Sequence, residues 1–146
     1  MTVKMTYGQL EQISSHPAVA QLFTAKMPTI YALRIHLMQR ALSEVLEPYV
    51  KIKLDLVTKF ADKDESGNPV VKDGQYQFSV PESQDQYRAD LQALWQEDVS
   101  VNVNKVKMPM SIFEKLPAQF SAADLSLFDL ILEFEDDNHR EEGATT

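Results

Sequence analysis

Apolar residues recur along residues 31–56 at alternating spacings of four and three. Eight positions make up this seam: Tyr31, Ile35, Met38, Leu42, Val45, Tyr49, Ile52 and Leu56. Their spacing averages about 3.5 residues, which is the heptad period, so the sequence predicts one long helix from about Thr29 to Phe60. A seam of this length needs a covering partner, either another part of the same chain or a second copy. The pattern therefore indicates packing and assembly rather than a reaction.

Pro48 falls inside this predicted helix. It lacks a backbone N–H, and its ring crowds the carbonyl of Glu44, at a cost of roughly 3 kcal/mol in a helix interior. Two outcomes are open: a kinked continuous helix, or two helices that meet near residues 46–47. The kink is favoured because the seam keeps its phase from Val45 to Tyr49. Further apolar residues lie off the seam and predict a helix covered on more than one side: Leu33, Leu37, Leu46, Val50, Leu54 and Val57.

Shorter helices are predicted on either side of the long one. Thr6 and Gln9 have the form of a capping box, so a short helix is expected from Tyr7. Pro17 and Pro81 each suit the first turn of a helix, the second of which should run to about Glu97. Two further helix starts are expected at Ser111 with Glu114 and at Ser121 with Asp124, and the last helix should run from about Ala122 to Phe134.

Two segments carry strand patterns. Asp73-Gly74 lies between Val70–Lys72 and Gln75–Val80 and supplies the positive backbone angles of a tight turn, so a β-hairpin is predicted. Valines then alternate with polar residues over 99–103, as in a half-buried strand. We expect this strand to join the hairpin in a small antiparallel sheet of three strands.

These elements predict a single α+β domain over residues 1–134, followed by an acidic and flexible tail over residues 135–146. In this domain a long kinked central helix packs on a small antiparallel sheet, made of the hairpin plus one strand, with shorter flanking helices. The length of 146 residues suits one hydrophobic core.

Composition narrows the function further. The chain has no cysteine, so thiolate chemistry and disulfides are excluded. Its net charge of −8 is uneven, because residues 1–60 hold seven Lys or Arg against four acids, whereas residues 61–146 hold seven against eighteen. This balance argues against direct nucleic-acid binding, which needs a dense basic surface. No signal peptide or membrane span is expected, and a cytosolic location is predicted.

The clearest candidate for a metal site is a turn with calcium-loop spacing. Its possible ligands are Asp62, Asp64, Ser66 and Asp73, with Gly67 at the sixth position and Asp73 at the twelfth. Against calcium, the exit is a predicted strand and Asp73 is shorter than the usual glutamate. The alternative, a solvated turn, is favoured, so the sequence predicts neither a metal nor a cofactor.

Catalytic patterns are otherwise lacking. His16, His36 and His139 share no metal-ligand spacing, and the chain has no phosphate loop, nucleophile elbow or zinc-protease motif. We therefore predict a protein that is not an enzyme and has no catalytic residues, and no partner-binding residue can be assigned. Four aromatic residues near the hairpin are expected in the core, with a surface anchor as the alternative: Tyr76, Phe78, Tyr87 and Trp95.

The order of parts resembles a family of small acidic proteins of tailed bacteriophages, of unsettled function. The resemblance covers about residues 28–135 and lies in three segments: Lys63-Asp-Glu-Ser-Gly-Asn-Pro-Val-Val-Lys-Asp-Gly-Gln-Tyr76, Glu97-Asp-Val-Ser-Val101 and Phe120-Ser-Ala-Ala-Asp-Leu125. It implies a viral origin and a role in particle assembly or in handling a host protein. It supplies no active site.

The resulting expectation is a structural or assembly factor of a phage that acts by protein–protein contact. Its partners would be other phage proteins or further copies of itself, in the host cytoplasm or in the virion. The alternative is an early phage protein that binds and inhibits a host factor through its acidic C-terminal half. The six acids between Glu133 and Glu142 would then mimic a run of phosphates.

Overall fold

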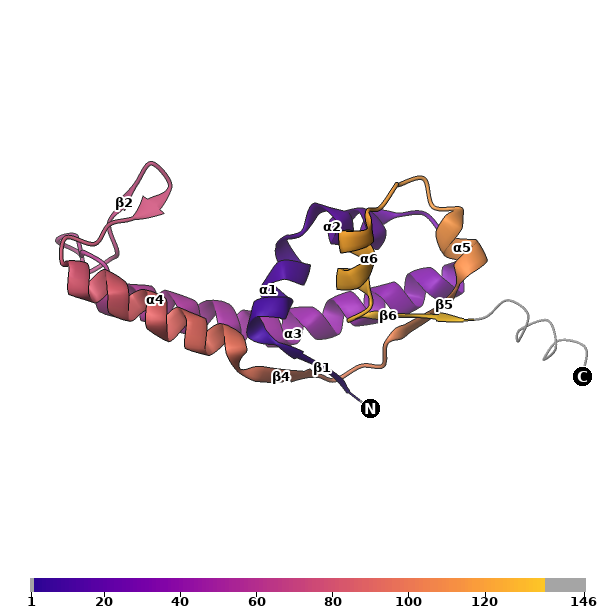
Figure 1. Cartoon of the computed structure of the whole chain (residues 1–146), viewed down its shortest axis with the longest axis horizontal. Helices are drawn as coiled ribbons and strands as arrows, with labels where there is room; N and C mark the ends of the chain where they lie inside the picture. Colours follow the sequence, from indigo (N-terminus) through magenta and orange to yellow (C-terminus); the bar gives the residue numbers. More distant parts are fainter. Residues whose placement is uncertain (1, 136–146) are drawn as a thin grey trace, which may run out of the picture.

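The computed structural model of this chain describes residues 2–135 and confirms the α+β class (Figure 1). In chain order, its elements are β1 (Val3–Thr6), α1 (Tyr7–Ser15), α2 (Pro17–Thr24), α3 (Thr29–Phe60), β2 (Val71–Lys72), β3 (Gln75–Tyr76), α4 (Pro81–Gln96), β4 (Asp98–Val101), β5 (Val106–Pro109), α5 (Met110–Glu114), α6 (Ala122–Phe128) and β6 (Leu132–Glu135). We call residues 50–96 the arm, because α4 returns along the second half of α3 and the β2–β3 hairpin caps the far end. The other described residues form the body.

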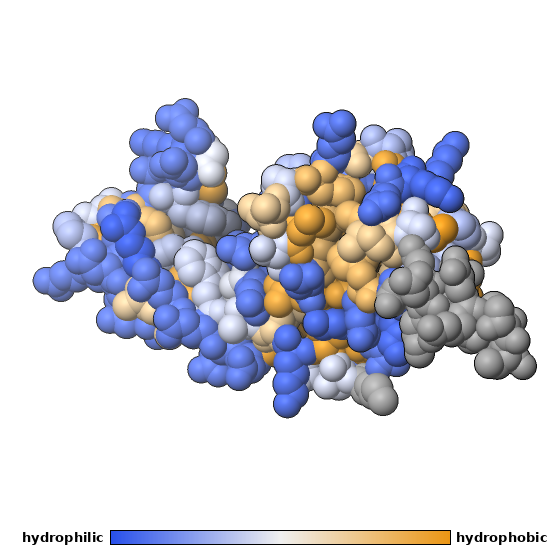
Figure 2. All heavy atoms as spheres, turned by 45° about the vertical axis from the view of Figure 1, so that its right-hand side comes forward, coloured by the Kyte–Doolittle hydropathy of each residue, from blue (hydrophilic) through white to orange (hydrophobic). Residues whose placement is uncertain are grey.

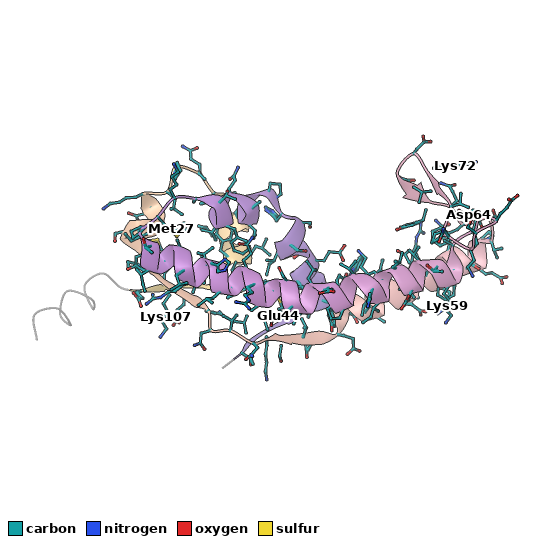
Figure 3. The ribbon with its side chains drawn as sticks, turned by 180° about the vertical axis from the view of Figure 1, so that it is seen from behind. Met27, Glu44, Lys59, Asp64, Lys72 and Lys107 are labelled. Atoms are coloured by element: carbon teal, nitrogen blue, oxygen red, sulfur yellow. The ribbon has the colours of Figure 1, made fainter. Side chains whose placement is uncertain are left out.

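Helix α3 confirms the long helix predicted from the seam. It runs without interruption from Thr29 to Phe60 and contains Pro48, so the chain does not divide into two helices there. Its axis changes direction beyond Glu44, as Figure 3 shows, in keeping with the predicted kink. One element therefore links the body to the arm.

The seam is covered by the chain itself over its first half. Tyr31, Ile35, Met38 and Leu42 are buried in the body, whereas Ile52 is exposed on the arm. Beyond Pro48 the buried positions of α3 are Tyr49 and Val57, with the half-buried Lys53 between them.

The strands within residues 2–135 form three separate pairs, so the predicted three-stranded sheet is wrong. Strand β4 pairs antiparallel with β1, with Val3 opposite Val101 and Met5 opposite Val99. All four of these side chains are buried, because the apolar alternation of both strands faces the core. The β2–β3 hairpin pairs only with itself at the far end of the arm.

The predicted last helix is also wrong in its length. Helix α6 starts at the expected capping box of Ser121 and Asp124 but ends at Phe128. The chain then forms β6, which lies parallel to β5 with Val106 opposite Leu132. The expected helix start at Ser111 and Glu114 is wrong by two residues, because the N-cap of the preceding helix α5 is Pro109 and the helix begins at Met110. The capping box of Thr6 and Gln9 is confirmed.

Hydrophobic side chains are concentrated in the body. Four phenylalanines close its C-terminal end with ring centroids 5.0 to 6.1 Å apart, namely Phe113, Phe120, Phe128 and Phe134. Figure 2 shows hydrophobic atoms gathered over the body on this face, and a mostly hydrophilic arm.

Within residues 2–135, none of the helices has the length and apolar character needed to cross a bilayer. Residues 136–146, with most of the predicted tail and His139, lie outside the described residues.

Candidate interaction surfaces

A polar cluster joins the arm to the body where α1, α3 and α4 meet. Glu11 of α1 accepts hydrogen bonds from the Tyr49 hydroxyl, from Lys53 Nζ at 2.8 Å and from Trp95 Nε1 at 2.9 Å. Trp95 Nε1 also lies 2.9 Å from the Tyr49 hydroxyl oxygen. We call these four residues the joint. No local sequence pattern indicates the joint, because its members are far apart in the chain.

Neighbouring residues hold the joint in place. The ring of Tyr7 stacks on that of Tyr49, with centroids 5.1 Å apart and planes 12° apart. A Cβ at Gly8 would lie 3.2 Å from both the Cβ and the carbonyl oxygen of Trp95. Glycine therefore allows α1 to approach α4 closely. The backbone N–H of Tyr7 also donates to the carbonyl of Glu97 at 3.0 Å.

The charges of the joint reinforce one another. Burial disfavours the Glu11 carboxylate, but the hydrogen bonds from Lys53, Tyr49 and Trp95 outweigh burial, so the pKa of Glu11 lies below its ordinary value. Burial and the hydrogen bond to the Glu11 carboxylate raise the pKa of Tyr49 well above its ordinary value. At neutral pH the carboxylate is therefore ionised, and the phenol keeps the proton that it donates. The cluster serves as a structural connection, since both carboxylate oxygens already have donors.

The lowered pKa of Glu11 predicts a pH-dependent contribution to stability. A carboxyl whose pKa is lower in the folded chain than in the unfolded chain stabilises the fold at pH values above the unfolded-state pKa, which is about 4.5 for Glu11. This contribution is lost as the pH falls through the folded-state pKa. Glu11→Gln should therefore unfold at lower urea concentration than the native chain at pH 7. The difference between the urea midpoints of unfolding of the native chain and the variant should become smaller as the pH is lowered from about 5 to about 3. A difference that stays constant over this range would contradict the assignment.

Apolar side chains are left uncovered on the outer side of the arm. Val50 and Leu54 lie one turn apart on α3 and are 54% and 51% exposed. The body half of α3 carries a second exposed stripe of three residues at helical spacing, namely Ile30, Leu33 and Leu37. Contiguous apolar side chains on a surface are typical of protein contact sites.

A groove lies between the body half of α3 and strands β1 and β5. Its volume is about 700 Å³, and exposed Leu37 and half-buried Val103 are among its apolar lining residues. Four cations surround it, namely Lys4, Arg34, Lys105 and Lys107, with Glu133 as the carboxylate of the lining. Arg34 donates to the carbonyl of Lys107 at 2.8 Å, and Lys105 donates to the carbonyl of Asp129 at 2.7 Å. None of these cations forms an ion pair with a carboxylate of residues 2–135.

The hairpin at the end of the arm exposes its apolar face. Val71 and Tyr76 lie directly opposite one another across β2 and β3 and are 55% and 43% exposed. The predicted turn is confirmed, because Asp73 and Gly74 have φ angles of 53° and 75°.

Of the four aromatic residues expected in the core, Tyr76 is exposed, Phe78 packs on Tyr87 with centroids 5.2 Å apart, and Trp95 belongs to the joint.

The residues of the calcium candidate have other roles in the structure. The Ser79 hydroxyl and backbone N–H donate to the Asp62 carboxylate and hold its pKa below the ordinary value. The Asp64 carboxylate accepts from the backbone N–H groups of Ser66 and Asn68, at 2.9 and 3.0 Å, as in an Asx turn. Asp73 occupies the hairpin turn. Within the described part of the chain, no three His, Cys, Asp or Glu side chains are grouped for a metal ion, so the structure does not bring this candidate together.

The two histidines within residues 2–135, His16 and His36, have different surroundings. His16 caps α2, accepting from the backbone N–H of Ala18 at 3.1 Å, and its Nε2 lies 3.6 Å from the Asp124 carboxylate. His36 is exposed on α3.

Comparison with known proteins adds no relative: no family model, curated protein or solved structure matches this chain.

Proposed function

We propose that this chain is a bacteriophage structural or assembly protein that is not an enzyme and acts by protein–protein contact. The observation that carries the proposal is the pair of uncovered apolar side chains on the arm, Val50 and Leu54. Neither side chain is needed to close the fold of the chain itself, and burying exposed apolar area on a partner is favourable by about 25 cal/mol per Å². The assignment to a phage draws on the resemblance of residues 28–135 described above.

The composition of purified virus particles tests this role. Particles of the virus that encodes the chain are purified on a density gradient and analysed by mass spectrometry, together with assembly intermediates from infected cells. We expect the chain in the particles or in the intermediates, co-purifying with other phage proteins. Its confinement to a complex with a host protein early in infection would contradict an assembly role.

The arm surface makes a second prediction. Val50→Ser with Leu54→Ser should abolish co-purification with phage proteins and change the free energy of unfolding by only about 0.5 kcal/mol, because both side chains are exposed. The matched control is Lys51→Ser with Asp55→Ser, two exposed polar residues of the same turns. Affinity pull-down from infected cells provides the measurement. Equal capture by both double variants would exclude Val50 and Leu54 as contact residues.

The second candidate function is inhibition of a host factor by the acidic C-terminal half. The observation that favours it is the excess of eighteen acids over seven cations in residues 61–146. An acidic surface of this kind attracts basic, nucleic-acid-binding proteins. If the acidic stretch mimics phosphates, a chain without residues 135–146 should fail to capture the host factor. Unchanged capture by the shortened chain would remove mimicry by this segment.

A further inference from the structure

The far end of the arm and the groove on the body have opposite charge. The far end of the arm, residues 61–85, holds six acids and two lysines. We call this segment the arm tip. Glu65, Asp73 and Glu82 are exposed on this segment, and so are Val71 and Tyr76, which lie opposite one another across the hairpin. The groove on the body presents Lys4 and Lys107, also exposed, around an apolar lining.

The two surfaces are complementary in a second respect. The arm tip projects two apolar side chains from a hairpin, whereas the groove is a hollow that contains the exposed Leu37. Leu33 lies about one helical turn from Leu37 and is also exposed, so the apolar surface continues along α3 beyond the groove. A projecting apolar pair on a segment with an excess of acids therefore matches a hollow apolar surface with cations around it.

A single copy does not bring these surfaces together. Figure 3 shows Lys107 beside the body half of α3, while Asp64 and Lys72 lie at the opposite end of the molecule. The continuous helix α3 holds the two ends apart. A contact between the arm tip and the groove thus requires two molecules.

We propose that the groove receives the arm tip of a second copy of this chain. Val71 and Tyr76 pack against Leu37, and the tip acids lie opposite Lys4 and Lys107. Because the two contacting surfaces differ, the contact is head-to-tail, and repetition produces a closed ring or an open filament. The inference rests on the proposed function only in that it assigns a self-assembly surface to an assembly protein.

Paired charge reversals test the proposal. One variant carries Lys4→Glu with Lys107→Glu in the groove, and the other carries Glu65→Lys with Glu82→Lys on the arm tip. Sedimentation velocity over a range of protein concentrations measures association of the full chain, alone and in mixtures. The native chain should associate reversibly, and more weakly as NaCl rises from about 0.05 M to about 0.5 M, because salt screens exposed charges.

Each variant alone should associate at least about tenfold more weakly than the native chain, since like charges then face one another. An equimolar mixture of the two should recover association, because each altered surface meets a complementary surface on the other variant. The matched control for the groove variant is Lys26→Glu with Lys51→Glu. It changes the net charge by the same amount as the groove variant, at exposed positions outside the groove, and should associate as the native chain does. Circular dichroism confirms that each variant is folded.

A native chain that stays monomeric at all concentrations and low salt would overturn the proposal. So would variants that associate like the native chain, or a mixture that gains nothing over its components. These outcomes can be distinguished from a failure of the proposed function. A chain that remains monomeric and is nevertheless found in virus particles would leave the assembly role standing and remove only this self-contact.

Discussion

Replacing Tyr49 by alanine is expected to lower the free energy of unfolding by about 4 kcal/mol. The side chain is fully buried, so the change leaves a cavity between α1, α3 and α4. It also removes the ring that stacks on Tyr7 and the hydroxyl that donates to Glu11. Urea unfolding followed by circular dichroism measures the loss.

The matched variant Tyr49→Phe separates packing from hydrogen bonding. It keeps the ring and its stacking on Tyr7 but removes the hydroxyl, which should cost about 1 to 2 kcal/mol. Equal losses for the phenylalanine and alanine variants would mean that the hydroxyl dominates. A loss below about 1 kcal/mol for the alanine variant would show that Tyr49 does not hold the arm to the body.

Phe128→Ala should be comparably damaging at the other end of the body, with a loss of about 3 to 5 kcal/mol. Phe128 is fully buried, and its ring meets those of Phe113 and Phe120 edge-on. Leu125→Ala on the same helix is the matched control, because Leu125 is exposed, and it should cost about 1 kcal/mol or less. The same urea titration measures both variants. Similar losses would contradict the burial of Phe128 within the aromatic cluster.

Local patterns in the sequence were sufficient to predict the helices. The seam fixed α3 from Thr29 to Phe60, and the two capping boxes located the starts of α1 and α6. These signals involve residues within one or two turns of each other, so no tertiary information is needed. The end of α6 was not predictable in this way, because the apolar residues from Leu130 to Leu132 fit a helix as well as a strand.

Strand pairing depends on residues that are distant in the sequence. Val3 and Met5 alternate over only four residues, too few to indicate a strand on their own, yet their pairing with β4 forms part of the core. The hairpin was correctly located by Asp73-Gly74, but nothing in its sequence indicates that it projects from the arm instead of joining β4. The joint shows the same limit, since Glu11 and Trp95 meet only once α1 and α4 have packed.

The interaction surfaces could be predicted only in part. Val50 and Leu54 are apolar residues off the seam, and the sequence predicts that other parts of the chain cover them. The structure leaves both exposed, because α4 covers a different side of α3. The acidity of the C-terminal half was evident from composition. The groove was not, because its cations come from three separate segments of the chain, represented by Lys4, Arg34 and the pair Lys105 and Lys107.

The pairing of β1 with β4 has a consequence for synthesis on the ribosome. Translation proceeds from the N-terminus, so Val3 emerges long before its partner Val101 is made. Until then the newly made β1 has an unpaired edge, and the apolar side of α3 lacks the strands that later cover it. A nascent chain paused between these two points would be a substrate for chaperones, and exchanging the order of segments by circular permutation would shorten that interval.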